Sequence, residues 1–354
     1  MTTDMTTGKK FGVGIIGFGR IGAEHSQWIA AAGGIVTAVV DITRARRSLA
    51  EARGLTTVDS MDALLERGDV DAVLVTTPTN MHFDHASRAI SAGKHVMVDK
   101  PVALDLAQTT KLDATAHQMR RVLSVFHNRR WDIDYLTVLQ AVRAGLFGRL
   151  INIESRLGQW GSCVGPAAKE YRPGWRNERR FGGGGLYDWG SHFVDQILQL
   201  MLPAKPASVF AQLRGNVWTR DCDDFARVCI SFDNNAVAMV EINTTTTAPL
   251  PRWHIDGTAG SAESPFSLSY DTQTWANLRF TAPDGSNRLI ERAQPGLSEA
   301  DLWRAFQRAC NGEGEPAVTL QSVTATMRVL DAARKSSRTN RSVELIKLLP
   351  PPRE

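Results

Sequence analysis

Asp188 and His192 form a pair of residues whose types and spacing suit proton transfer. If a helix begins near Leu186, these two residues are four positions apart and lie on one face, within reach of a single ligand. An imidazole beside a carboxylate is suited to moving a proton near neutral pH. The structural alternative is a capping aspartate and a half-buried histidine bonded to backbone. Asp195, one turn further on, either orients His192 or is structural.

Lys100 is the third candidate for chemistry. It stands between Asp99 and Pro101, directly after a predicted strand over His95–Val98. In a parallel sheet this is the edge at which a nicotinamide or its substrate binds. The ammonium group there would stabilise a developing alkoxide. Taken alone, Lys100 is equally a surface lysine, so its interpretation depends on the other features of the sequence.

A glycine motif near the start of the chain predicts a dinucleotide site. The apolar run over residues 11–16 leads into Gly17, Gly19 and Gly22. The first glycine permits a tight turn, the second lets the backbone approach a phosphate, and the third lets the next helix pack closely. The N-H groups at the start of that helix, together with its dipole, would bind the pyrophosphate. A glycine turn in another kind of α/β domain is the alternative.

Asp41 bears on the choice of cofactor. It ends the predicted strand Ile35–Val40, about 20 residues beyond the glycine motif, where a ribose-binding carboxylate is expected. A carboxylate accepts hydrogen bonds from the 2′-hydroxyl and repels a 2′-phosphate at short range, so the sequence favours NAD over NADP. Arg44, Arg46 and Arg47 follow on a predicted helix. They are either alternative partners for that phosphate or a solvated helix face.

The elements that position these residues alternate through the first part of the chain. The predicted strands are Val13–Ile16, Ile35–Val40, Thr56–Val58, Ala72–Thr76, His95–Val98 and Val122–Phe126. The predicted helices are Ala23–Ala32, Arg44–Arg53, Met61–Glu66, Phe83–Ala92 and Leu104–Met119. Strands and helices at this spacing indicate a doubly wound parallel sheet of the α/β Rossmann class, which we assign to residues 1–127.

From about residue 150 the period of the sequence changes. Apolar and polar residues alternate over Ile151–Leu157, Ala207–Leu213, Ala226–Phe232, Ala236–Asn243 and Arg252–Gly257, as in strands with one solvated face. A glycine-rich helix start over Gly182–Leu202 interrupts them, and helices are predicted at Leu302–Cys310 and Leu320–Ser336. Residues 128–354 are therefore predicted to form an α+β C-terminal domain with a large, mainly antiparallel open sheet.

Composition excludes several classes of protein. The net charge of +4 comes from scattered arginines without a basic tail, which argues against a nucleic-acid partner. No apolar run approaches the length of a membrane span, and residues 1–10 lack the apolar core of a secretory signal, so we expect a cytoplasmic protein. The four cysteines show no C-x-x-C spacing and fit free thiols rather than a metal site.

In combination, these motifs resemble the Gfo/Idh/MocA family of NAD(P)-dependent oxidoreductases. The matching motifs are Gly17-x-Gly19-x-x-Gly22, Thr77-Pro78-x-x-x-His82, Lys100-Pro101 and Gly-Gly-Gly-x-Leu186-x-Asp188-x-Gly190-x-His192-x-x-Asp195. The resemblance implies that His192 takes the substrate hydroxyl proton while hydride passes to the nicotinamide. It also implies that Lys100 polarises the reacting oxygen and that Asp188 holds the substrate or tunes His192.

The resemblance extends to binding residues. Those expected to bind the cofactor are Gly17, Gly19, Arg20, Ile21, Asp41, Thr77, Pro78, Asn80, His82, Asp99, Lys100, Trp175 and Arg176. Those expected to bind substrate are Lys100, Asn128, Arg129, Asp188 and His192, and the aromatic residues Trp160 and Tyr171 of the 158–181 segment are further candidates apart from the resemblance. Trp175 and Arg176 are alternatively an interdomain packing residue and its ion pair. Asp99 stands where many members have glutamate, and with Asn128-Arg129-Arg130-Trp131 it resembles a subgroup that includes scyllo-inositol dehydrogenases.

The expected activity is a dehydrogenase that uses NAD, with NADP less favoured, on a small-molecule polyol or sugar. The family also contains glycosidases that use bound NAD in a transient oxidation, and non-catalytic dinucleotide-binding regulators. Retention of Lys100, Asp188 and His192 argues against a regulator. An open sheet with one apolar face free of helices predicts a homodimer or homotetramer, because that face would be buried against another subunit.

Overall fold

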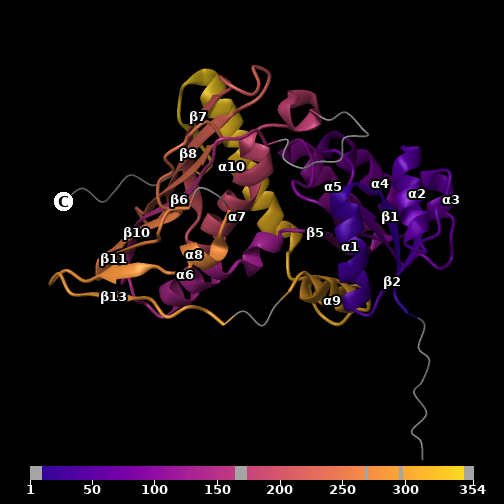
Figure 1. Cartoon of the computed structure of the whole chain (residues 1–354), viewed down its shortest axis with the longest axis horizontal. Coiled ribbons are helices and arrows are strands. Elements are labelled where there is room, and N and C mark those ends of the chain that lie inside the picture. Colours follow the sequence, from indigo (N-terminus) through magenta and orange to yellow (C-terminus); the bar gives the residue numbers. More distant parts are fainter. Residues whose placement is uncertain (1–9, 164–173, 268–269, 295–297, 347–354) are drawn as a thin grey trace, which may run out of the picture.

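The computed structural model describes residues 10–163, 174–267, 270–294 and 298–346 (Figure 1). The first sheet contains β1 (Gly12–Ile16), β2 (Ile35–Val40), β3 (Ala72–Val75), β4 (His95–Val98) and β5 (Leu123–Val125). Its strand order is β2-β1-β3-β4-β5, and every pair is parallel. The helices between them are α1 (Arg20–Ala31), α2 (Arg44–Ala52), α3 (Met61–Leu65), α4 (His82–Ser91) and α5 (Leu106–Met119). The doubly wound parallel sheet is confirmed.

The predicted strand over Thr56–Val58 is wrong. Thr57 forms only an isolated bridge with Val39 of β2. Backbone hydrogen bonds join Val39 to the residues on either side of Thr57, so the segment pairs at one point on the edge of the sheet and then leaves it.

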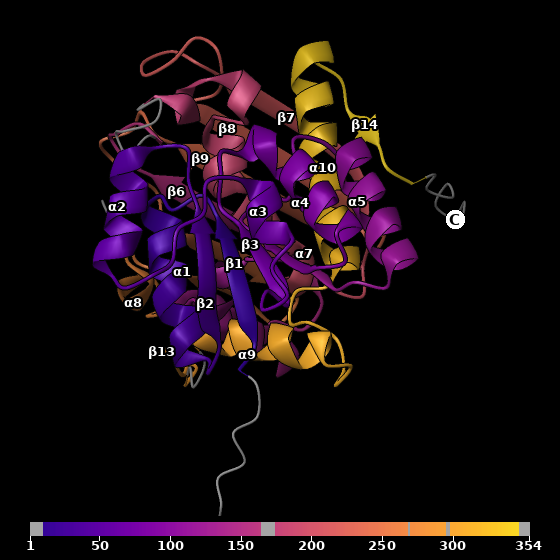
Figure 2. The ribbon, with the colours of Figure 1, turned by 90° about the vertical axis from the view of Figure 1, so that its right-hand side faces the viewer.

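Both faces of the parallel sheet are covered. Within β3, Ala72 and Leu74 enter one apolar core while Val73 and Val75 enter the other, as the alternation of a doubly buried strand requires. The core around Ala72 also holds α9 (Glu299–Cys310), whose Trp303 is fully buried. Figures 1 and 2 both show α9 beside α1. A helix from late in the sequence therefore completes the N-terminal core.

The second sheet contains β6 (Leu150–Gly158), β7 (Pro206–Arg214), β8 (Phe225–Phe232), β9 (Val237–Asn243), β10 (Trp253–Gly257), β11 (Gly260–Glu263), β12 (Arg279–Thr281), β13 (Asn287–Leu289) and β14 (Val343–Glu344). Its order is β13-β12-β11-β10-β6-β9-β8-β7-β14. The pairs are antiparallel except β6 with β9, which is parallel. The predicted mainly antiparallel sheet is confirmed.

Helices cover one side of this sheet. Figure 1 shows α6 (Ile133–Arg143), α7 (Ser191–Leu200) and α10 (Leu320–Thr339) between it and the N-terminal part, with the short α8 (Thr272–Trp275) near α6. On its other side Phe210, Cys229 and Val237 are exposed. No helix within the described residues is both long and apolar enough to cross a lipid bilayer.

Candidate active site

The three glycines of the first motif occupy the positions that the sequence predicts for them. Gly17 has φ of +90°, which a side chain would strain. A Cβ on Gly22 would come within 2.3 Å of the Gly17 carbonyl oxygen, so α1 packs there only because the side chain is missing. At Gly19 a Cβ would meet no atom of the described residues within 4 Å, and this residue lines a large cleft. The backbone at Gly19 is therefore open to a phosphate of a dinucleotide.

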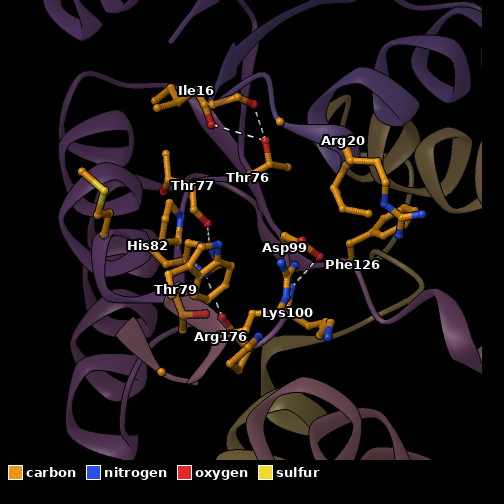
Figure 3. Close-up of a pocket in the computed structure, with 18 of the residues that line it drawn as sticks. Ile16, Arg20, Thr76, Thr77, Thr79, His82, Asp99, Lys100, Phe126 and Arg176 are labelled. Atoms are coloured by element: carbon orange, nitrogen blue, oxygen red, sulfur yellow. Dashed lines mark hydrogen bonds between the residues drawn. The ribbon is translucent and has the colours of Figure 1, made fainter. Parts of the chain in front are cut away.

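The cleft has a volume of about 880 Å³ and runs from the glycine motif to α7. Most predicted site residues line it: Gly17, Gly19, Arg20, Ile21, Asp41, Thr77, Pro78, His82, Asp99, Lys100, Asn128, Arg129, Trp175, Arg176, Asp188 and His192. Figure 3 shows Thr77, Lys100 and Arg176 around the cavity, although they come from distant segments. The structure thus brings into one cleft residues from motifs that lie far apart in the sequence.

Three predicted residues do not line the cleft as described. Trp160 is 58% exposed and packs edge-on against Trp218 instead, with ring centroids 5.3 Å apart. Asn80 is not among the lining residues, and its carbonyl oxygen is buried. Tyr171 lies outside the described residues.

Asp41 joins the glycine turn to the end of β2. Its carboxylate accepts a hydrogen bond from the Phe18 backbone N-H at 2.7 Å and two more from Thr43, at 2.8 and 2.9 Å. Arg46 and Arg47 line the same end of the cleft, and the Arg47 guanidinium donates to the Asp41 backbone carbonyl at 2.7 Å. The carboxylate and the arginines therefore meet where the adenosine end of a dinucleotide would bind.

Lys100 and Asp188 are in direct contact. The Lys100 ammonium donates to the Asp188 backbone carbonyl at 2.6 Å and to its carboxylate at 3.1 Å. The Arg176 Nε lies 3.6 Å from the same carboxylate. Burial raises the pKa of Asp188, but the two cations outweigh burial and hold the pKa below its ordinary value of 3.8. Asp188 is thus an ionised anchor for both cations.

His82 contacts the loop that carries Lys100. One ring nitrogen faces the Pro101 carbonyl oxygen at 2.8 Å and the other faces the Thr77 carbonyl oxygen at 2.7 Å. Burial lowers the pKa of His82, so the ring is neutral and its single N-H donates to one of these two oxygens. His82 also lines the cleft, and its role in binding the cofactor stays a prediction. The histidine fixes the ends of β3 and β4 against each other and so fixes the backbone beside Lys100.

His192 is buried at the edge of the cleft. The helix there begins with one π-helical turn (Leu186–Gly190) and continues as α7. This places both Asp188 and His192 on the cleft, as their spacing predicts, and π-helical turns recur at functional sites. Burial, followed by the charges of Lys100, His127 and Arg129, lowers the pKa of His192 well below 6.5. The imidazole is therefore neutral at pH 7 and able to accept a proton.

The four glycines before this helix allow two close backbone approaches. Gly184 has φ of +103°, and a Cβ there would come within 2.3 Å of the Asp223 carboxylate. A Cβ on Gly183 would come equally near the Arg176 carbonyl oxygen. Asp223 accepts a hydrogen bond of 2.7 Å from the Leu186 backbone N-H, at the start of the π-helical turn. Sequence reasoning missed Asp223, which has no motif around it.

Asp195 is structural. Arg130 donates to both of its carboxylate oxygens, at 2.7 and 2.6 Å, and Thr326 lies at 3.3 Å. The carboxylate is thus paired with Arg130, which favours the structural alternative for Asp195 over a role in orienting His192.

Trp189 is a second residue that sequence reasoning missed, although it lies inside the motif between Asp188 and Gly190. Its indole lines the cleft and stacks on Tyr270, with centroids 4.8 Å apart. Arg129 covers the Tyr270 ring at 4.4 Å and lies 3.4 Å from the Asp132 carboxylate. Trp189, Tyr270 and Arg129 therefore stack on one another, and Trp189 and Arg129 line the same cleft as His192.

Two family models match this chain. The model described as an oxidoreductase family with an NAD-binding Rossmann fold matches residues 11–127. The model of the GFO/IDH/MocA C-terminal domain matches residues 135–263. The chain belongs to the Gfo/Idh/MocA family.

Relatives from bacteria share most of the length of this Gfo/Idh/MocA protein. The uncharacterised oxidoreductase YdgJ of Escherichia coli is 29% identical, over 92% of this chain and 96% of its own. The scyllo-inositol 2-dehydrogenase (NADP(+)) IolW of Bacillus subtilis is 24% identical, over 81% of this chain and 82% of its own. An NAD-binding protein from Listeria innocua superposes with a TM-score of 0.85 at 29% identity, covering 95% and 97% of the two chains.

Membership of the Gfo/Idh/MocA family makes the chain an NAD(P)-binding oxidoreductase. The residues present fit such a cofactor, because the glycine turn leaves its backbone open at Gly19 and Asp41 stands at the end of β2.

Proposed function

We propose that this protein is an NAD-dependent dehydrogenase that interconverts a secondary alcohol and a ketone on a cyclic polyol or sugar. The observation that carries the proposal is the meeting of Lys100, Asp188 and His192 on the cleft that also holds the glycine turn. A proton acceptor, a cation for the reacting oxygen and a dinucleotide site are the parts that this reaction needs. The polyol dehydrogenase among the relatives supports the substrate class.

His192 accepts the proton of the substrate hydroxyl, because its imidazole is neutral at pH 7 and borders the cleft. Lys100 stabilises the negative charge that develops on the same oxygen. Asp188 holds the Lys100 ammonium in place and shares its charge with Arg176. NAD, when bound, supplies the hydride acceptor. Trp189 and Arg129 line the same cleft, where they would contact the substrate.

The cofactor would be held by the glycine turn, by Asp41 and by residues that follow β3 and β4, including Thr77, Pro78 and Asp99. Asp41 supports NAD over NADP because its carboxylate repels a 2′-phosphate. Arg46 and Arg47 at the same end of the cleft would keep some binding of NADP. Trp175 and Arg176 also line the cleft and would contact the cofactor there.

We assign cofactor binding to residues 1–127, and substrate binding and assembly to residues 128–354. The side of the second sheet that carries the exposed Phe210 and Val237 is the surface on which we expect a homodimer, or a homotetramer built from it.

The test is NADH formation by the purified protein with NAD or NADP and a panel of inositols, aldoses and aryl glycosides. NADH formation from an inositol or aldose is the expected result. Release of the aryl alcohol without accumulation of NADH would instead indicate hydrolysis, and tight binding of NAD with no turnover across the panel would contradict the proposal.

A further inference from the structure

Among the described residues, no carboxylate forms a hydrogen bond with His192, although a catalytic histidine often has such a partner. Asp195 is occupied by Arg130 and Thr326, and Asp188 is occupied by Lys100 and Arg176. The His192 side chain is nevertheless almost fully buried, with 4% of the residue exposed. Its Nδ1 atom is buried and has no hydrogen-bond partner within the described residues. A buried polar atom without a partner is costly, so this nitrogen is expected to have a use.

The ring that faces His192 is that of His127. This residue follows β5 and is 2% exposed. The two imidazoles meet edge to face, with centroids 5.6 Å apart and planes at 83°. Nδ1 of His127 is also buried, and it too has no partner in the part of the chain that the structure describes. Each of the two rings in contact therefore has one buried nitrogen without a hydrogen-bond partner among the described residues.

The charges around the pair differ on its two sides. His192 faces Lys100 and Arg129, which oppose a positive charge on its ring. His127 faces Arg130 and Lys100 as well, but also Asp195, which favours a positive charge. Burial lowers the pKa of His127 to about 4, so both rings are neutral at pH 7. Asp195 thus offsets part of the effect of the cations at His127, whereas every charge named at His192 opposes a proton on that ring.

We propose that His127 is the relay partner of His192 and takes up the charge of the proton removed from the substrate. Because Nδ1 of His192 is buried, Nε2 is the nitrogen available to a hydroxyl in the cleft. Nε2 accepts the hydroxyl proton, and the proton on Nδ1 passes to Nδ1 of His127, while the hydride leaves for NAD as proposed above. After the ketone leaves, the proton on His127 returns to Nδ1 of His192 and the proton on Nε2 passes to water that enters the cleft, so both rings are restored and one proton is released. Catalytic hydrogen bonds are often long before substrate binds, and the ring contact is expected to shorten in the complex.

This inference rests on the proposed function, and its tests distinguish a failure of the relay from a failure of that function. Single-turnover NADH formation is measured in mixtures of H₂O and D₂O, with the inositol or aldose of the panel that is turned over fastest. The relay moves two protons, so a plot of the wild-type rate against the fraction of D₂O should be curved rather than linear. A straight line for the wild-type protein would overturn the relay even if no variant folds.

Two substitutions separate a relay from packing. His127→Phe keeps a ring against His192 but has no nitrogen, and His127→Asn keeps a hydrogen-bond acceptor but no basic group. Both should slow the single turnover roughly 10- to 100-fold and give a straight line in D₂O mixtures, with NAD binding unchanged. Wild-type rates in the Phe variant would show that the ring only packs, and wild-type rates in the Asn variant would show that a hydrogen bond suffices. Either result overturns the relay.

His25→Phe is the matched control. His25 is another buried imidazole; it packs against Phe126, the neighbour of His127, and accepts a hydrogen bond from Trp303. Its replacement should keep the curved dependence on D₂O.

A measurement without substrate tests the relay even if the panel shows no turnover. The relay requires the tautomer of His192 that carries its proton on Nδ1. Nitrogen NMR of histidine-labelled protein with NAD bound should show this tautomer, and a proton on Nε2 would overturn the relay whatever the substrate is.

Discussion

Lys100 and Asp188 are 88 residues apart in the sequence, and yet the ammonium of one donates to both the backbone carbonyl and the carboxylate of the other. The contact joins the end of a strand in the parallel sheet to the π-helical turn that leads into α7. It therefore fixes the candidate catalytic lysine and the helix that carries His192 relative to each other. Substitutions at either end should affect catalysis more than folding.

Asp188→Asn tests the charge in this contact. The backbone carbonyl still accepts from Lys100, but Lys100 and Arg176 lose their shared counter-charge. We expect kcat/KM for the best polyol or sugar to fall roughly 100-fold, while the Kd for NAD stays close to that of the wild-type protein. Glu299→Gln is a matched control, because it removes another carboxylate that lines the cleft without touching Lys100. Equal losses in the two variants would contradict the role given to Asp188.

Asp41→Asn tests the preference for NAD. The substitution removes the charge that repels a 2′-phosphate and leaves Arg46 and Arg47 in place. The ratio of kcat/KM with NAD to kcat/KM with NADP should fall roughly 10-fold or more. Asp59→Asn, which removes a different carboxylate from the same end of the cleft, should change the ratio less. A ratio that does not move in the Asp41 variant would show that the carboxylate does not select the cofactor.

Asp223 makes stability depend on pH. Burial raises the pKa of this carboxyl from 3.8 to about 6. The folded state thus favours the protonated form, so the contribution to stability is fully present below pH 3.8 and is lost as the pH rises through about 6. From pH 4 to pH 7, the free energy of unfolding of Asp223→Asn relative to the wild-type protein should shift by roughly 2 kcal/mol in favour of the variant. Urea unfolding at several pH values measures this difference, and a value independent of pH would show that Asp223 has an ordinary pKa.

The pair of Arg130 and Asp195 should contribute strongly to stability. Both side chains are buried, at 11% and 1% exposure, and they are joined by two hydrogen bonds. Arg130→Met leaves an uncompensated buried carboxylate and should cost about 3–5 kcal/mol of unfolding free energy. Adding Asp195→Asn to that variant should recover part of the loss because the lone charge is removed. A double variant less stable than Arg130→Met would contradict this account.

The sequence predicts most of the parallel sheet because each of its signals is local. Gly17, Gly19 and Gly22 have their roles within a few residues of one another, and an apolar run such as β3 needs both faces covered wherever it lies. Thr56–Val58 failed as a strand because its three residues carry too weak a pattern to show that they pair at one point only.

The remaining features depend on contacts between distant segments. The parallel pairing of β6 with β9 and the packing of α9 on α1 leave no periodic signal that names the partner. Strands β11, β12 and β13 are too short to show alternation. Asp223 accepts a hydrogen bond from Leu186, which is 37 residues away. The sequence predicts that Trp160 binds substrate, because the contact between Trp160 and Trp218 is visible only in the structure.

The most direct test of the proposed function compares His192→Asn and Lys100→Met with the wild-type protein. NADH formation is measured with the best inositol or aldose of the panel, and NAD binding is measured on the same preparations. We predict that both variants bind NAD within about threefold of the wild-type Kd and lose turnover by roughly 100-fold or more. Turnover retained in both variants would contradict the assignment of this cleft as the active site.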